Sequence, residues 1–235
     1  MAIILIETAT SVCSVALSES GRVIFEKASF DGPSHASVLG VFVEAAVQEA
    51  KAYKIRLDAV AISGGPGSYT GLRIGVSMAK GLCCGFGIPL LSIPTLKIMA
   101  FKAISNFASA EGLLEEVHFC PMIDARRMEV YAALYDSSLR PIQAARPEII
   151  TEESYAEMLD KRRIYFVGNG ASKCKEVIRS PQAVFLEDIH PMAADMAMLS
   201  ERALKEGAFE SVAYFEPFYL KDFIATTPRN TVFNL

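Results

Sequence analysis

The sequence predicts an α/β protein made of two copies of a β-β-β-α-β-α unit. Each half of the 235-residue chain opens with a strand-like segment, adds two more strand-like segments and then alternates helix-like and strand-like segments. The opening segments also match, since one ends in Glu7 and the other in Asp124. A hydrophobic content of 51% is enough to bury a sizeable core. Such a duplication predicts two lobes with a cleft between them.

The first half is expected to begin with a central strand, because residues 3–6 are continuously apolar. Ser20 and Gly21 form the turn of a following hairpin, and Pro33 with Ser34 as N-cap opens the first helix. In chain order we expect strands at 3–6, 12–17 and 23–25, a helix to about residue 50, a strand at 57–63, a helix at 72–86, a strand at 88–92 and a helix from residue 95.

The second half repeats this order with little sequence identity to the first. The expected elements are strands at 117–123, 130–135 and 140–145, a helix at 152–159, a strand at 164–167, a short helix, a strand at 183–186 and a long helix at 193–205. We therefore divide the chain into an N-terminal lobe with a glycine-rich loop and two docking helices, a C-terminal lobe and a loosely ordered tail, at residues 1–105, 106–221 and 222–235.

Composition excludes several classes of protein. The five cysteines are an odd number without CxxC spacing, which argues for a reducing compartment and against disulfides or a structural zinc site. The net charge of −4 is not typical of a protein that holds RNA alone. The chain opens without a signal-peptide pattern, and charges and Pro89 interrupt the apolar stretch at 72–93. We expect a cytoplasmic protein that does not enter a membrane.

A glycine-rich loop at residues 63–71 links a predicted strand to a helix N-terminus. Glycines allow backbone N–H groups to approach a ligand, and a helix start favours an anion. The loop has neither the lysine of a Walker loop nor the third glycine of the dinucleotide fingerprint. The alternative is a tight turn that lets a close-packed helix begin. The candidate nucleotide or anion residues are Gly64, Gly65, Gly67, Ser68 and Thr70, with Glu7 and Asp124.

The carboxylates of Glu7 and Asp124 could serve a structural role instead of binding a ligand. Acids at strand ends can hold a metal–phosphate or activate water, but they also commonly cap and brace hairpins. The three histidines, His35, His118 and His190, are far apart and form no HxxxH or HExxH pair. There is also no GxSxG nucleophile motif. The sequence therefore predicts no metal site and no catalytic residue.

Two predicted helices are apolar around nearly their whole circumference. In residues 38–50 only a narrow polar stripe interrupts the apolar positions, and in residues 72–86 Arg73 and Lys80 are the only charges. Such helices are expected to be covered on both sides, either by other parts of this chain or by a partner. We expect a partner, with a homodimer through the same face when the chain is alone. The candidate docking residues are His35, Leu39, Phe42, Val76, Lys80 and Cys83.

The glycine-rich segment at residues 65–75, Gly-Pro-Gly-Ser-Tyr-Thr-Gly-Leu-Arg-Ile-Gly, resembles the signature of the TsaB (YeaZ) family. The match spans almost the whole chain and includes His35 and the segments at 6–10, 14–17, 123–127, 130–131, 168–170 and 219–221. One departure is Glu7, where the family usually has Asp, so that the carboxylate sits one methylene further out.

The resemblance implies an actin/sugar-kinase/Hsp70-like (ribonuclease H-like) fold and the role of a non-catalytic partner subunit. Such proteins pair with the catalytic paralogue TsaD and work with the ATPase TsaE to transfer a threonylcarbamoyl group to the adenosine beside the tRNA anticodon. The tRNA is met only through the complex. The catalytic relative holds its metal with an HxxxH helix, and the comparable stretch at 94–100 has no histidine.

The resemblance implies no intrinsic cofactor, with at most weak ATP or ADP binding in the complex. The alternative function is an independent nucleotide-dependent small-molecule kinase or hydrolase that uses the glycine loop with Glu7 and Asp124.

Overall fold

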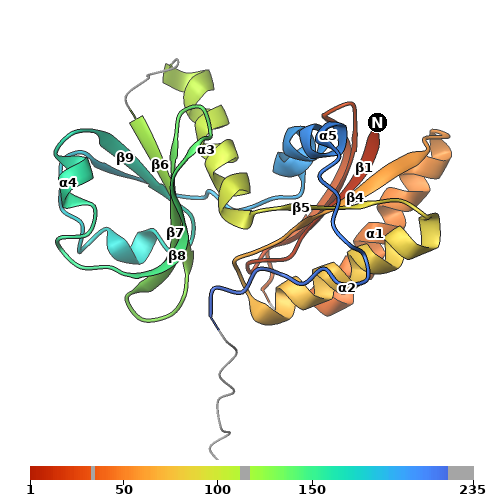
Figure 1. Cartoon of the computed structure of the whole chain (residues 1–235), viewed down its shortest axis with the longest axis horizontal. Helices are drawn as coiled ribbons and strands as arrows, with labels where there is room; N and C mark the ends of the chain where they lie inside the picture. The colour runs from red at the N-terminus through yellow and green to blue at the C-terminus, as the bar shows by residue number, and fades with distance from the viewer. Residues whose placement is uncertain (33–34, 112–116, 222–235) are drawn as a thin grey trace, which may run out of the picture.

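The computed structural model describes residues 1–32, 35–111 and 117–221, and it shows two lobes that are each built on a five-stranded sheet (Figure 1). The first sheet has the order β3-β2-β1-β4-β5, with β1 (Ala2–Glu7), β2 (Cys13–Glu19), β3 (Arg22–Ser29), β4 (Leu57–Ser63) and β5 (Leu90–Ile93). The second has the order β10-β9-β6-β7-β8, with β6 (Val117–Asp124), β7 (Glu129–Asp136), β8 (Pro141–Ile149), β9 (Arg163–Val167) and β10 (Ala183–Leu186).

The two sheets have the same topology. In each, three antiparallel strands form a meander, and two further strands add in parallel beside the first strand. The central strand β1 is buried along its whole length, which explains its unbroken apolar run. The duplicated α/β unit and the actin/sugar-kinase/Hsp70-like fold are confirmed.

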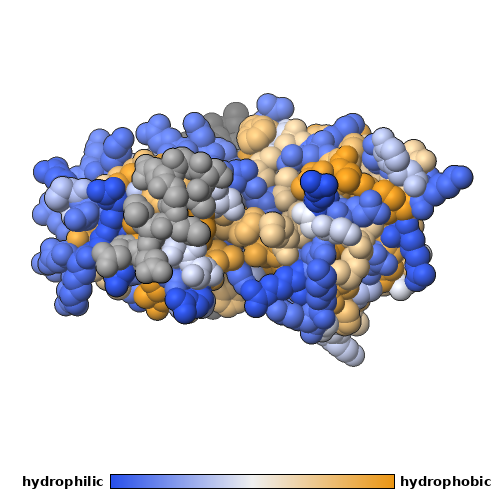
Figure 2. All heavy atoms as spheres, turned by 90° about the horizontal axis from the view of Figure 1, so that it is seen from above, coloured by the Kyte–Doolittle hydropathy of each residue, from blue (hydrophilic) through white to orange (hydrophobic). Residues whose placement is uncertain are grey.

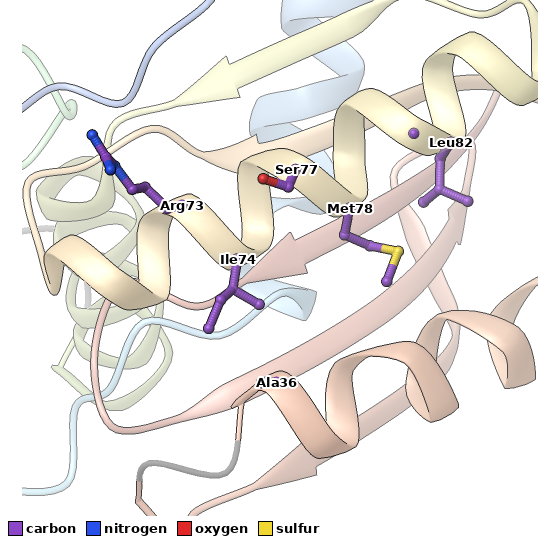
Figure 3. A pocket seen from close by; sticks show the side chains of 7 residues that line it. Ala36, Arg73, Ile74, Ser77, Met78 and Leu82 are labelled. Carbon is purple, nitrogen blue, oxygen red and sulfur yellow. The ribbon is translucent and has the colours of Figure 1, made fainter.

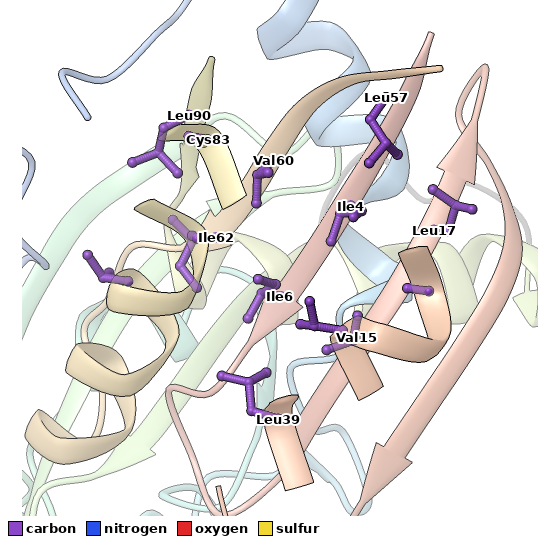
Figure 4. Packing of buried hydrophobic residues seen from close by; sticks show 14 of the residues in the cluster. Ile4, Ile6, Val15, Leu17, Leu39, Leu57, Val60, Ile62, Cys83 and Leu90 are labelled. Carbon is purple, nitrogen blue, oxygen red and sulfur yellow. The ribbon is translucent and has the colours of Figure 1, made fainter. Parts of the chain in front are cut away.

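Helices cover both faces of the first sheet. The helices α1 (His35–Ala52) and α2 (Tyr69–Phe86) lie side by side on one face, where Leu39 and Cys83 pack on Ile4, Ile6 and their neighbours (Figure 4). On the other face, η2 (Ala194–Met196) and α5 (Ala197–Glu206) pack against alternate residues of the same strands. Both faces of the central strands are therefore sealed from water.

The two lobes exchange helices. The helix α3 (Thr95–Glu111) follows the first sheet but packs mainly on the second, where Ala103 and Phe107 contact Val117 and Phe119. In return, α5 follows the second sheet and covers the first (Figure 1). The expected lobe boundary between residues 105 and 106 falls inside α3, because the apolar side of this helix is completed by the other lobe.

Several expected helices differ from the observed ones. The helix expected at 152–159 is shortened to α4 (Ala156–Leu159), since Tyr155 has a φ of 62° and interrupts it. The short helix after Gly170 is η1 (Ser172–Cys174), and the helix expected at 193–205 divides into η2 and α5. The expected cap at Ser34 and the tail at 222–235 lie outside the described residues.

One face of the molecule carries both polar and apolar groups. Seen from the top of Figure 1, hydrophilic side chains surround hydrophobic areas in the middle and toward the right (Figure 2). Within the ranges that the structure describes, no helix is both long and apolar enough to cross a membrane.

Candidate functional site

A cavity of about 690 Å³ lies between the two lobes. Both lobes contribute to this interlobe cavity, the first through the starts of α1 and α2 and the second through the turn after β6. Its lining includes Thr10, Ser11, His35, Gly67, Ser68, Tyr69, Thr70, Asp124, Arg126, Tyr131, Asn169, Tyr219 and Lys221. Hydroxyl and charged groups of both lobes therefore face the cavity, beside apolar side chains such as Ile74, Ile123 and Phe218.

The structure brings only some of the candidate nucleotide residues to this cavity. Gly67, Ser68, Thr70 and Asp124 line it. The other three, Gly64, Gly65 and Glu7, are buried behind it. The seven candidates therefore do not all line one cavity, because the loop turns its first two glycines and the end of β1 into the lobe.

Four backbone N–H groups of the glycine loop are hydrogen-bonded within the chain. Gly64 N donates to Ile93 O at 2.8 Å, and Gly65 N donates to Thr95 Oγ1 at 3.2 Å. Ser68 N donates to Ala9 O at 2.6 Å, and Gly71 N donates to the N-cap oxygen of Ser68 at 3.3 Å. These four groups stabilise the turn and the start of α2, so they are not presented to an anion.

The loop glycines serve close packing. A Cβ at Gly67 would lie 2.3 Å from Ala9 O, and one at Gly71 would lie 2.1 Å from Thr8 O. Gly65 has a φ of 102°, which side chains rarely adopt. These geometries favour the alternative that the loop is a tight turn from which a close-packed helix begins.

Glu7 lies at the buried end of β1. Its carboxylate accepts a hydrogen bond from the backbone N–H of Ala9. Burial raises the pKa of Glu7 to about 7, although the bond from Ala9 opposes the rise. Because the side chain has no exposed surface, Glu7 braces the turn after β1 and does not reach the interlobe cavity.

Asp124 is exposed at the corresponding end of β6. It forms an ion pair with Lys173 and accepts a hydrogen bond from the backbone N–H of Arg126 at 2.9 Å. Lys173 also donates to the carbonyl oxygens of Arg127 and Glu129 in the turn between β6 and β7. Asp124 thus braces its hairpin while facing the cavity.

The three histidines do not come together. His35 is buried, and its Nε2 lies 2.8 Å from Thr10 O at the start of α1. His118 lies on β6, and the ring of His190 packs edge-on against Phe30. The described residues contain no group of three or more His, Cys, Asp and Glu side chains that could hold a metal ion.

A second hollow, of about 630 Å³, lies between α1 and α2 on the outer surface of the first lobe (Figure 3). Ile74 and Met78 point from α2 toward α1, while Arg73 leaves α2 on the other side. We call this hollow the α1–α2 groove; it is lined by Ala36, Arg73, Ile74, Ser77, Met78, Gly81 and Leu82. Arg73 is the one charged residue in an otherwise apolar or small lining.

The expected docking residues lie mostly elsewhere. Leu39, Val76 and Cys83 are at most 5% exposed and pack against the first sheet, so they belong to the core (Figure 4). His35 lines the interlobe cavity, and Lys80 donates to Ala213 O at 3.2 Å. This correction arises because both faces of each helix are apolar, and the sequence alone does not show which one meets the sheet.

Phe42, the sixth candidate, is partly buried and packs against the core from its edge. The sequence analysis did not include the groove residues Ile74, Met78 and Leu82 among the docking candidates. They recur at the i, i+4 and i+8 positions of α2, which is the signal that could have identified one continuous helix face.

Sequence reasoning also missed a C-terminal strap at residues 208–221, which runs alongside α2 (Figure 1). It forms an isolated antiparallel bridge between Glu210 and Leu90, and Phe218 N donates to Gly64 O at 2.7 Å. At its end, Lys221 forms an ion pair with Glu129 of the second lobe. The strap therefore connects the edge of the first sheet, α2 and the second lobe.

Comparison with known proteins shows which family the chain resembles. The family model "TsaD: tRNA N6-adenosine threonylcarbamoyltransferase" matches residues 23–229. The tRNA threonylcarbamoyladenosine biosynthesis protein TsaB of Escherichia coli is 30% identical over 96% of each chain. Its Bacillus subtilis counterpart is 29% identical over 76% of this chain and 75% of the relative.

Solved structures agree with the sequence comparisons. YeaZ from Pseudomonas aeruginosa is 25% identical and has a TM-score of 0.72, over 93% of this chain and 99% of the other. With a family model covering most of its length and a TsaB relative aligned almost from end to end, the chain belongs to the TsaD-type family and, within it, to the TsaB (YeaZ) proteins of tRNA threonylcarbamoyladenosine biosynthesis.

Proposed function

We propose that this chain is a non-catalytic subunit that pairs with the catalytic paralogue TsaD and activates it. The observation that supports the pairing is the apolar α1–α2 groove, which the described residues of the chain leave open to solvent. Because the TsaD family model matches residues 23–229, a range that includes α1 and α2, we expect the paralogue to carry the same two helices in its first lobe. Packing the two pairs together as a helical bundle would cover both apolar faces at once.

The other parts of the proposed complex rest on the same family role. TsaE joins the pair, tRNA is bound only through the complex, and the reaction takes place in the cytoplasm. When TsaD is absent, two copies of this chain cover the groove for one another as a homodimer.

In this proposal the chain supplies no catalytic residue and needs no cofactor of its own. Glu7 is buried, and Asp124 is engaged by Lys173, so neither carboxylate is poised as a free base at the cavity. Any ATP or ADP held in the interlobe cavity within the complex is bound weakly, since four loop N–H groups are already bonded to the protein. The kinase alternative gains no support from this geometry.

The test is the substitution Met78→Glu. Met78 is partly buried in the groove wall, so the variant should fold, but docking would bury its charge without a partner. Such a burial costs several kcal/mol, which predicts that affinity for TsaD falls by roughly 100-fold or more. Titration calorimetry with purified TsaD measures the loss, and reconstituted tRNA modification should fall with it.

The matched control is Met198→Glu on α5. Met198 is 63% exposed and lies on the opposite side of the first sheet, so this variant should bind TsaD like the unmodified chain. If Met78→Glu also bound normally, the docking face would lie elsewhere. If the unmodified chain bound no TsaD, the proposed function itself would be wrong.

A further inference from the structure

The guanidinium of Arg73 is held in one place at the rim of the α1–α2 groove. It lies over the ring of Tyr69, 4.2 Å from the centroid, and its Nε donates to the hydroxyl of Tyr219 at 3.2 Å. The rings of Tyr69 and Tyr219 are themselves 5.0 Å apart. We call these three residues the clasp; it joins the first turn of α2 to the C-terminal strap.

The clasp leaves most of the donor capacity of Arg73 unused. A guanidinium carries five N–H donors, and within the described part of the chain only Nε is seen to be engaged. Glu216 of the strap acts on Arg73 electrostatically, but none of the ion pairs in the described structure includes Arg73. Because Arg73 is exposed, its remaining N–H groups are accessible to a partner, and the geometry of a guanidinium matches that of a carboxylate.

The position of this cation matters because the rest of the groove offers no charge. The lining residues include no Asp or Glu, and Glu216 beside the groove already acts on Arg73 of its own copy, so the lining of a second copy would bring no further carboxylate to Arg73. A partner that carries an acid beside its apolar docking helix would form an ion pair with Arg73. A wholly apolar partner would instead remove water from the guanidinium and offer no hydrogen bond in its place.

We infer that Arg73 determines the specificity of the docking face by pairing with a carboxylate of the partner, and that Tyr69 and Tyr219 position it for this contact. The inference rests on the proposed function, because it concerns the same groove. It adds that the partner is distinguished from a second copy of this chain by charge. Fixing the side chain before docking also removes part of the ordering cost of forming the ion pair.

The experiment compares Arg73→Met, which keeps the length of the side chain without charge, with Arg73→Glu. Affinity for TsaD should fall roughly tenfold for Arg73→Met and further for Arg73→Glu, because the second change places two carboxylates together. Raising the salt concentration should weaken binding of the unmodified chain more than binding of Arg73→Met, since salt screens the charge pair. Arg56→Glu is the control for net charge, as Arg56 is exposed and lies outside the groove lining.

The role of the clasp is tested by Tyr219→Phe, which keeps the ring and removes the hydroxyl that holds Nε. Its affinity for TsaD should fall by a few-fold, while its thermal midpoint stays close to that of the unmodified chain. In the double variant Arg73→Met with Tyr219→Phe the second change should add nothing, because the hydroxyl acts only through Arg73. Independent losses in the two variants would overturn the positioning role.

Carbodiimide crosslinking supplies a direct readout. In the Arg73→Lys variant the introduced amine should crosslink to a carboxylate of TsaD, and mass spectrometry of the product identifies that residue. If Arg73→Met and Arg73→Glu both bind TsaD like Arg56→Glu, or if self-association falls as much as TsaD binding, the inference is wrong although the proposed function stands. Failure of Met78→Glu to weaken binding would instead count against the proposed function.

Discussion

Glu7 shows how burial changes the chemistry of a single carboxylate. The side chain has no exposed surface, and burial raises its pKa to about 7. The folded protein therefore holds the proton more tightly than the unfolded chain, in which the value is near 4.5. This contribution to stability is complete below the unfolded value and is lost as pH rises through about 7.

We predict that Glu7→Gln is more stable than the unmodified protein at high pH. The amide stays neutral, so the variant avoids the burial of a charge, and its advantage should grow between pH 5 and pH 8.5 by up to about 3 kcal/mol. Urea unfolding at several pH values measures the difference. Glu44→Gln on the exposed side of α1 is the control, and an advantage of Glu7→Gln that does not rise with pH would contradict the assignment.

At the scale of one element, α2 uses its glycines for different purposes. Gly71 and Gly75 lie against Thr8, so the start of the helix approaches the end of β1 more closely than a side chain would allow. Gly81 has open space where a Cβ would be, and it lines the α1–α2 groove. One side of the helix is thus fitted to the sheet and another is left open at the groove.

We predict opposite stability effects for the same substitution at two positions of α2. Gly71→Ala should destabilise the protein by about 1–3 kcal/mol, because the new Cβ would meet the carbonyl oxygen of Thr8. Gly81→Ala should stabilise it by about 0.5–1 kcal/mol through helix propensity. Thermal melts resolve both, at about 2–4 °C per kcal/mol for a chain of this size. If both substitutions changed the stability in the same direction, the difference in packing around Gly71 and Gly81 would not control their effects.

At the scale of the whole molecule, the first lobe is completed by distant parts of the chain. Ile3, Leu5 and Leu91 are covered by η2 and α5, and the strap adds Val212 and Phe215 to the core on the other face. Lys102 of α3 and Asp195 of η2 form an ion pair at 2.9 Å between the two exchanged elements. The lobes are therefore parts of one cooperative structure.

We predict that a fragment of residues 1–105 does not fold by itself. Without α5 it would expose one apolar face of the first sheet, which is a large patch for a soluble domain. Circular dichroism melts should show no cooperative transition for the fragment and a sharp one for the whole chain. Co-expression with residues 106–235 should restore a soluble complex. A sharp, native-like transition of the fragment alone would contradict this view of the fold.

The sequence by itself determined the elements and their duplication. Strands such as β1 and β6 were predicted because a largely apolar segment that ends in an acid is a local signal. The start of α2 followed from its glycine-rich loop. The family signature lies in the same local segments. These features depend on neighbours in the sequence, so periodicity and turn chemistry were sufficient to identify them.

Only the tertiary structure decided which faces and partners these elements have. Val76 and Met78 lie two residues apart and are both apolar, but Val76 is buried in the core on the sheet, whereas Met78 is only partly buried against that core and also lines the groove. The bond between Arg73 and Tyr219 joins residues 146 positions apart, and no local pattern announces it. The orientation of an all-apolar helix and the path of the strap are set by packing between distant segments, which is why the sequence left both undetermined.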